Sequence, residues 1–267
     1  MIRVFPRKTK WTPTDDLAFI GEPGLFRPPV QPVKISCTFT WDIPEVERLY
    51  RAWSAYYPDV ELGGPAFGDP GGEFVSGMFV KPGVTFTSRG CNKECKHCFA
   101  SLREGRIREL PIVDGWDVAD NNLLACSQAH VEAVFKMLKR QPEPIKLSGG
   151  LDADLFTERH VELLKSIRLQ YAWFACDYPG AILALERVAD LMSDFSQQKK
   201  RCYVLIGFGG ESIRQAEKRL RAVYRLGFDP MAMLYQGETD IKYSGDWLNL
   251  RRYWVLPAIY RSQEKNK

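Results

Sequence analysis

Six short apolar segments alternate with amphipathic helical segments from about Gly83 onward, and this alternation constrains the fold more than any other feature of the chain. In the first helical segment, Val131, Val134 and Leu138 recur at helical spacing and form one apolar stripe. Alternating strands and helices predict a parallel sheet, in which the carboxyl ends of all strands meet at one edge. The predicted strands are Val84–Ser88, Asp117–Asp120, Ile145–Ser148, Tyr171–Cys176, Cys202–Ile206 and Met231–Tyr235.

Residues that are typical of helix ends flank these helical segments. Ser127 and Thr157 are predicted N-caps, and Ser212 with Gln215 forms a capping box. Gly227 stands where a helix end favours a left-handed residue. The basic residues of this last helix are predicted to form a solvated face, since charge runs usually serve solubility. They are Arg214, Lys218, Arg219, Arg221 and Arg225.

The first 80 residues are rich in proline, glycine and aromatic residues, and they predict a separate βαβ unit. Its parts are a strand over Ile35–Thr40, a helix over Glu45–Tyr56 and a strand over Val60–Leu62. At the other end, Trp247–Tyr260 predicts an amphipathic helix that is kinked at Pro257 and covers the sheet. The expected division is an appendage over 1–80, a core over 81–243 and a C-terminal helical segment over 244–267.

The run CNKECKHC places thiols at Cys91, Cys95 and Cys98, directly after the first predicted strand of the core. Three thiolates at this spacing can bind three irons of one [4Fe–4S] cluster and leave the fourth iron open. A ferredoxin run would need a fourth cysteine, which is missing here. A structural zinc site stays open as an alternative, although zinc favours four ligands and no second cysteine pair follows.

The CxxxCxxC run, with His97 just before its last cysteine, resembles the signature of the radical S-adenosylmethionine (radical SAM) superfamily. The resemblance implies a partial (β/α)6 barrel, one [4Fe–4S] cluster on Cys91, Cys95 and Cys98, and S-adenosylmethionine on its open iron. An external electron donor of the flavodoxin or ferredoxin type would reduce the cluster. The reaction expected from the resemblance is cleavage of the cofactor to a 5′-deoxyadenosyl radical that abstracts hydrogen from a substrate.

The resemblance also implies residues that bind the cofactor. Family members carry a Gly-Gly-Glu stretch after the second strand for its amino group; here Asp120 and Asn122 occupy that place, and their side chains can accept hydrogen bonds from an ammonium group. Gly149 and Gly150 follow the third strand and are interpreted as close-approach glycines beside the cofactor, with a tight turn as the alternative.

The segment from Ile206 to Glu211 resembles the stretch at the fifth strand of methylthiotransferase-like members, with Gly209 in place of their proline. In that picture Gly207 and Phe208 lie against the adenine, and His97 packs on it. Asp177 and Tyr235 stand at strand ends, where they are predicted to contact the substrate or the cofactor ribose.

Two further cysteines stand at or just after strand ends. Cys126 and Cys176 are candidate hydrogen-atom donors to a substrate radical, and the alternative for each is a small buried hydrophobe.

The accessory domains of the methylthiotransferase and cobalamin branches are not found in the sequence. The βαβ unit resembles the tail of a cobalamin-binding domain, but the chain carries no D-x-H-x-x-G motif. An appendage that closes one side of the barrel is therefore the favoured interpretation. Two other functions stay open: a methyl- or methylthiotransferase relative, and a non-catalytic iron–sulfur binding or electron-transfer protein.

Composition and charge indicate the compartment and the kind of partner to expect. Seven cysteines, an odd number with three clustered, indicate a reducing compartment, so a cytoplasmic protein is expected. No apolar run approaches the roughly 18 residues of a membrane span, so no membrane partner is expected. The net charge of +4 favours a nucleotide or nucleic acid as substrate over a peptide or small metabolite.

Overall fold

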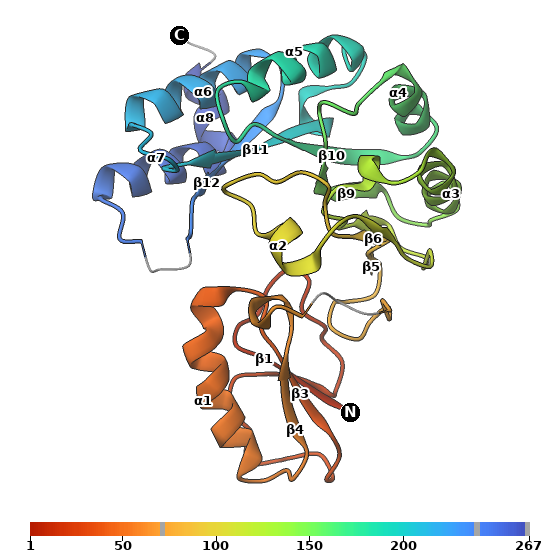
Figure 1. The fold of residues 1–267 in the computed structure, drawn as a ribbon, viewed down its shortest axis with the longest axis vertical. Coiled ribbons are helices and arrows are strands. Elements are labelled where there is room, and N and C mark those ends of the chain that lie inside the picture. Colours follow the sequence, from red (N-terminus) through yellow and green to blue (C-terminus); the bar gives the residue numbers. More distant parts are fainter. Residues whose placement is uncertain (70–72, 238–240, 265–267) are drawn as a thin grey trace.

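The chain forms an α/β fold with one parallel sheet of four strands and another of six (Figure 1). The structure is a computed structural model, and it describes residues 1–69, 73–237 and 241–264. The four-stranded sheet belongs to the N-terminal segment, which lies below the six-stranded sheet in this view. The parallel α/β class predicted from the sequence is therefore confirmed.

Every strand of the larger sheet is parallel to its neighbours, and its order in space follows its order along the chain. This order is compatible with a partial barrel. The strands run in the order β5 (Val84–Thr85), β8 (Asp117–Val118), β9 (Ile145–Leu151), β10 (Leu169–Ala175), β11 (Lys200–Ile206) and β12 (Asp229–Leu234). The connecting helices are α3 (Gln128–Leu138), α4 (Glu158–Lys165), α5 (Ala181–Leu191) and α6 (Ile213–Arg225), with 3₁₀ turns at Leu123–Ala125 and Gln197–Lys199.

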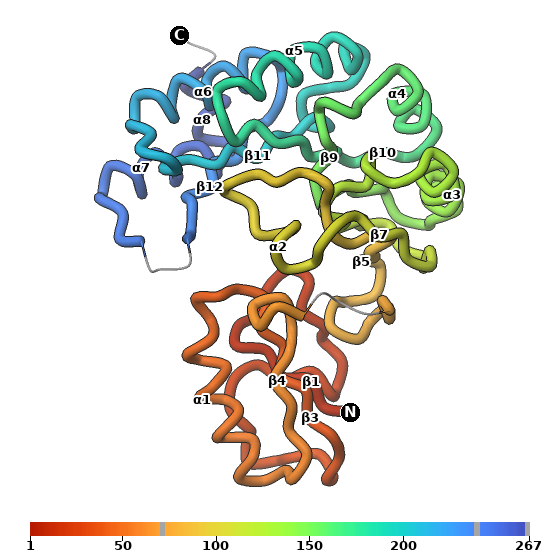
Figure 2. Tube along the Cα trace, in the orientation of Figure 1, coloured from red at the N-terminus to blue at the C-terminus, as the bar shows by residue number. Residues whose placement is uncertain are grey.

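Residues of each strand alternate between the helix side of this sheet and its other face. In β11, Cys202, Val204 and Ile206 are fully buried in the main hydrophobic core. Tyr203 and Leu205 between them are only partly buried. Because successive side chains of a strand point to opposite faces, β11 keeps some access to solvent on the face away from the helices. On that face of β10, Tyr171 and Trp173 are buried, and Trp173 stacks on Tyr203. Figure 2 traces the helices along the outer side of the strands.

The structure confirms the helix ends predicted at Ser127, at Ser212 with Gln215, and at Gly227. Ser127 Oγ accepts a hydrogen bond from the backbone N–H of His130 at 3.2 Å. Ser212 and Gln215 form the capping box, with Ser212 N–H donating to Gln215 Oε1 at 2.9 Å. Gly227 adopts φ +79°, the left-handed conformation expected after α6.

The first strand of the core is shorter than the predicted Val84–Ser88. The chain leaves the sheet after Thr85, and β6 (Ser88–Arg89) pairs antiparallel with β7 (Arg108–Glu109). Between these two strands lie the cysteine loop and the short helix α2 (Ala100–Glu104). Gly90 begins the loop at φ +81°, and a Cβ there would lie 2.4 Å from Arg106 O, so the turn requires glycine.

The N-terminal segment has more strands than the predicted βαβ unit. The predicted unit is present as β3 (Val33–Ser36), α1 (Ile43–Ser54) and β4 (Val60–Gly63). Two strands missed by the sequence analysis, β1 (Ile2–Phe5) and β2 (Ala18–Ile20), extend it to the order β2-β1-β3-β4. Each of these two strands is too short to show a period of apolar residues in the sequence. The 3₁₀ turns of this segment are Thr40–Asp42 and Pro65–Phe67, and its core is separate from the main core.

The C-terminal segment covers the end of the larger sheet as two helices, α7 (Gly245–Val255) and α8 (Pro257–Glu264). The break falls at Pro257, as predicted. Trp254 and Tyr260 are fully buried, and their rings stack at a centroid distance of 5.3 Å. The domain limits at 80/81 and 243/244 stay a prediction, with residues 238–240 and 265–267 outside the described ranges. Within those ranges, no helix is long and apolar enough to cross a membrane.

Candidate functional site

The three clustered cysteines lie together on the loop between β6 and α2. None of them forms a disulfide; Cys91 and Cys95 are half-buried and Cys98 is exposed. The loop is closed at its ends, because Cys91 N–H donates to Gly105 O at 3.1 Å and Cys98 N–H donates to Cys95 O at 2.9 Å. Burial first, then the neighbouring thiols, raises the pKa of Cys95. Three thiols within electrostatic reach of one another are therefore available on one short loop.

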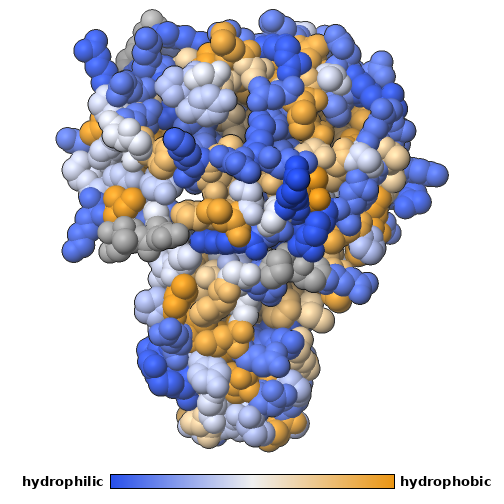
Figure 3. All heavy atoms as spheres, viewed as in Figure 1, coloured by the Kyte–Doolittle hydropathy of each residue, from blue (hydrophilic) through white to orange (hydrophobic). Residues whose placement is uncertain are grey.

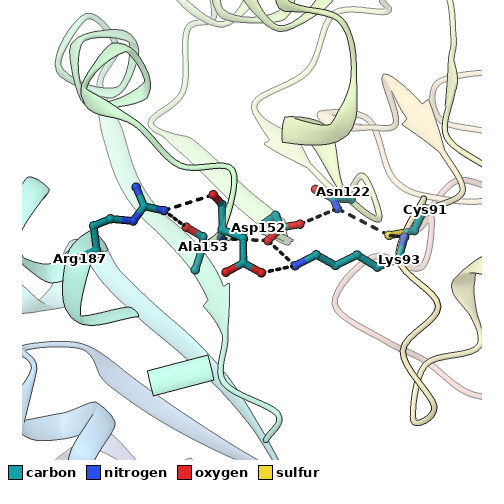
Figure 4. A network of polar contacts seen from close by, with 7 residues as sticks. Cys91, Lys93, Asn122, Asp152, Ala153 and Arg187 are labelled. Atoms are coloured by element: carbon teal, nitrogen blue, oxygen red, sulfur yellow. Dashed lines mark hydrogen bonds and ion pairs between the residues drawn. The ribbon is translucent and has the colours of Figure 1, made fainter. Parts of the chain in front are cut away.

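Asn122 joins the cysteine loop to the sheet (Figure 4). It follows β8, and its Nδ2 lies 3.6 Å from Cys91 Sγ and donates to Asp152 Oδ2 at 3.2 Å. Asp152 follows β9. The carboxyl ends of β8 and β9 thus meet the first cysteine, as the parallel sheet predicted.

Lys93 ties the loop to the same place. Its Nζ donates to Asp152 Oδ1 and Asp154 Oδ2, both at 2.7 Å. Although burial lowers the pKa of Lys93, the bonds to the two carboxylates raise it above its usual value. Arg187 of α5 holds the acidic segment by donating to Ala153 O at 2.6 Å (Figure 4). It also donates to Phe156 O at 2.5 Å. The contact of Lys93 with the two acids was not predicted, because the predicted strand ended at Ser148, whereas β9 continues to Leu151 and so brings Asp152 to the strand end.

Asn122 also carries the clearest sign of an unmet contact. Asn122 is only 5 % exposed, and its Oδ1 has no hydrogen-bond partner in the described structure. A buried carbonyl oxygen without a donor costs about 1–3 kcal/mol, so such an atom calls for an explanation. An acceptor beside Cys91 fits the role that the resemblance gave Asn122, which is to accept from the amino group of a cofactor on the open iron.

Asp120 is placed differently from its predicted partner. It is 1 % exposed, and it accepts from Thr87 N–H and Thr87 Oγ at 2.6 Å each and from Ser88 Oγ at 2.8 Å. Burial raises its pKa, and these hydrogen bonds act against the rise. Its contacts therefore tie β8 to the chain that leaves β5, whereas Asn122 is the residue at the cysteine loop.

The two glycines after Ser148 both lie in β9, but only Gly149 approaches another part of the chain closely. A Cβ at Gly149 would lie 1.9 Å from Asp120 O, so this glycine allows β9 to pack closely on the segment after β8. Gly150 adopts φ +95° with open space around it. Gly150 thus lies within β9 and not in a tight turn, and the close approach at Gly149 is to the segment after β8.

The far end of the cysteine loop meets the carboxyl ends of β10, β11 and β12. His97 Nε2 lies 3.4 Å from Asp177 Oδ2, and Asp177 Oδ1 accepts from Leu205 N–H at 3.0 Å. The His97 ring contacts Phe208 edge-on at 5.6 Å, and Phe208 contacts Tyr235 at 4.7 Å. Four residues singled out from separate parts of the sequence therefore form one wall: His97, Asp177, Phe208 and Tyr235.

A buried ion pair supports the turn that carries Phe208. Gly207 adopts φ +78°, and its N–H donates to Glu211 Oε2 at 3.2 Å. Glu211 Oε1 accepts from Arg219 at 2.5 Å, and Arg219 also donates to Cys176 O at 2.5 Å and Leu205 O at 2.7 Å. The prediction of a solvated Arg219 is wrong: its side chain is 5 % exposed, because the carbonyl ends of β10 and β11 require a donor there.

The two candidate hydrogen donors differ in access. Cys126 follows a 3₁₀ turn near Ser88 and is half-buried, and burial raises its pKa to about 11. Cys176 is 0 % exposed and belongs to the main core, and burial raises its pKa to about 12. The alternative of a small buried hydrophobe describes Cys176, while Cys126 stays a candidate.

Stability above pH 9 is expected to depend on Cys176. The pKa of its thiol is 9.0 in the exposed state and about 12 in the folded protein. As pH rises between these values, the unfolded state releases the proton first, so the free energy of unfolding falls. We expect a loss of about 1 kcal/mol between about pH 8 and about pH 10 from this group. Urea unfolding of the wild type and Cys176→Ala measures it. Equal pH slopes in the two proteins would contradict the prediction.

The cysteine loop offers thiols without a preformed site for a single ion. In the described ranges, no three His, Cys, Asp or Glu side chains are grouped to hold one metal ion. Ligands of one zinc ion must converge at about 2.3 Å from it. A scan against protein-family models and a search of the curated proteins find no match for this chain.

Proposed function

We propose that the chain is a radical SAM enzyme, with a partial (β/α)6 barrel that presents one [4Fe–4S] cluster at the carboxyl ends of its strands. Cys91, Cys95 and Cys98 would hold the cluster. The observation that carries the proposal is Asn122, whose Nδ2 reaches Cys91 Sγ and whose buried Oδ1 has no hydrogen-bond partner among the described residues.

When bound, a reduced cluster supplies the electron that cleaves S-adenosylmethionine to a 5′-deoxyadenosyl radical, which abstracts hydrogen from the substrate. Asn122 Nδ2 would donate to the Cys91 thiolate and stabilise its charge, as outer hydrogen bonds do at metal sites. Asn122 Oδ1 would accept from an ammonium group. Lys93, held by Asp152 and Asp154, fixes the loop and places a positive charge beside the thiolates.

The far wall of the loop would receive the rest of the cofactor. Phe208 and His97 offer aromatic surfaces to an adenine, and Asp177 offers carboxylate oxygens beside them. Phe208 is itself held in place by its edge-on contact with Tyr235. An external electron donor of the flavodoxin or ferredoxin type would complete the system.

The test is anaerobic reconstitution with iron and sulfide, followed by dithionite and S-adenosylmethionine. Formation of 5′-deoxyadenosine, measured by chromatography, is the expected result. Electron paramagnetic resonance reports in the same sample whether the cofactor changes the cluster signal. An assembled cluster whose signal the cofactor leaves unchanged, with no 5′-deoxyadenosine, would overturn the proposal in favour of an electron-transfer protein.

Asn122→Ala is expected to lower 5′-deoxyadenosine formation by about 10- to 100-fold, the usual effect of losing a hydrogen bond to a metal ligand. The variant removes the donor to Cys91 and the acceptor for the amino group together. The cofactor-induced change in the paramagnetic signal should weaken in parallel. Asn249→Ala, on the exposed side of α7, is the matched control. Equal product from Asn122→Ala and the control would remove Asn122 from the site.

A further inference from the structure

A cavity of about 630 Å³ lies between the N-terminal segment and the first strands of the larger sheet. Ser36 and Gly63, at the carboxyl ends of β3 and β4, line one side of it. Phe86 and Asn121, which follow β5 and β8, line the other. Its size falls within the range of pockets that hold small organic ligands. Since both sides are required, neither part of the chain forms this cavity alone.

The cavity adjoins the cysteine loop. Arg89 lines it two residues before Cys91, and Asn121 lines it next to Asn122. Glu104, another lining residue, accepts from Gly90 N–H at 3.2 Å and so holds the start of the loop. An occupant of this cavity would therefore lie beside the segments that carry the candidate cluster site.

Aromatic and aliphatic side chains form much of the cavity wall. Phe74 and Phe86 meet edge-on at a centroid distance of 5.4 Å, and Trp11, Met78 and Phe79 line the cavity with them. Figure 3 shows hydrophobic residues on the N-terminal segment close to its junction with the larger part of the molecule. Such a wall favours an occupant with a flat or apolar body.

Acidic groups outnumber basic groups in the same wall. Its two basic side chains are paired, Lys34 with Glu61 at 3.1 Å and Arg89 with Glu104 at 3.4 Å. Three further acidic residues line the cavity, Asp69, Glu73 and Asp120, of which Asp120 already accepts hydrogen bonds from Thr87 and Ser88. With five acidic and two basic residues, the lining has a negative formal charge. Carboxylates beside aromatic faces attract organic cations and repel phosphates.

We propose that this cavity is the substrate site, and that its occupant is a small organic amine with an apolar or aromatic body. The N-terminal segment then builds half of a binding site instead of only closing the barrel. The proposal replaces the nucleotide or nucleic acid that the net charge of the whole chain favoured, because the local charge of the cavity is opposite. Its assignment as a substrate site rests on the proposed function, whereas its binding chemistry does not.

The test uses the full chain without a cluster and three probes: tryptamine, its near-isosteric anion indole-3-propionate, and adenosine monophosphate. Saturation-transfer NMR detects binding, and titration gives the affinities. Tryptamine is expected to bind about tenfold more tightly than either anion, since like charges across an interface are disfavoured. Absence of tryptamine binding, or equal binding of either anion, would overturn the proposal.

Variants locate the binding. A Cβ at Gly63 meets no described atom within 4 Å, so Gly63→Trp adds bulk at the cavity wall without backbone strain. Tryptamine affinity should fall about tenfold or more in this variant, because the added ring occupies ligand volume. Gly24→Trp is the matched control, since its Cβ position is also open and Gly24 does not line the cavity. Glu73→Gln should weaken tryptamine about threefold, with Glu47→Gln on α1 as its control. An unchanged affinity in Gly63→Trp would place the binding elsewhere and refute the site.

These measurements separate the two proposals. Failure of the proposed function appears as missing 5′-deoxyadenosine in the reconstituted protein, while tryptamine still binds the chain without a cluster. Failure of the cavity proposal appears as lost amine binding, while cofactor cleavage remains.

Discussion

Cys95→Ala is expected to abolish assembly of the cluster and, with it, all formation of 5′-deoxyadenosine. A cube whose open iron must bind a cofactor has only three protein thiolates, and in this loop no other cysteine accompanies Cys91, Cys95 and Cys98. Iron and sulfide analysis after reconstitution should fall from about four of each per chain to near zero. The paramagnetic signal of the reduced cluster should disappear as well.

Cys126→Ala is the matched control for this experiment, because Cys126 is also half-buried but lies off the loop. It should keep the full complement of iron. Circular dichroism shows whether Cys95→Ala stays folded, and the change is small because Cys95 does not belong to either hydrophobic core. A complete cluster in Cys95→Ala would refute the ligand assignment, and a colourless protein with one bound zinc would support the structural zinc alternative.

The larger sheet was predictable because its strands and helices satisfy local rules. Strand β11 alternates buried and partly buried residues, and α6 begins at the capping box of Ser212 and ends at Gly227. Such signals lie within a few residues of one another, so they can be recognised in the sequence without knowledge of the tertiary fold. The same logic placed the cysteines at the carboxyl edge of the sheet.

The parts that were missed depend on contacts distant in sequence. β1 and β2 are too short to show a period, and only their pairing with β3 makes them strands. The split of the first core strand follows from Asp120, which binds Thr87 and Ser88 from 32 or 33 residues away. No local sequence pattern predicts a hydrogen bond between residues so far apart.

The candidate site divides in the same way. The cysteine motif led to His97, and strand ends led to Asn122 and Asp177; the structure brings the latter two to the cysteine loop. The clamp between Lys93 and Asp152 was missed, because partners 59 residues apart are joined only by the crossover through two strands. Burial separated Cys176 from Cys126, and sequence patterns report burial poorly at strand ends.

Arg219→Met is expected to destabilise the fold by about 3–5 kcal/mol, the usual result of removing one partner from a buried ion pair. Arg219 and Glu211 have side chains only 5 % and 11 % exposed, so little solvent can replace the lost contact. The variant leaves Glu211 charged and strips the donor from Cys176 O and Leu205 O. Urea unfolding followed by circular dichroism measures the free energy of unfolding.

Arg225→Met tests whether the loss comes from burial of the pair or from loss of charge on α6. Arg225 is exposed in the last turn of the same helix, so its replacement should change stability by less than about 1 kcal/mol. Equal losses in the two variants would contradict a special role for Arg219. If the folded fraction of Arg219→Met also binds cofactor weakly, the cause lies in the Gly207 turn. Glu211 holds that turn through Gly207 N–H, and Phe208 reaches His97 from it.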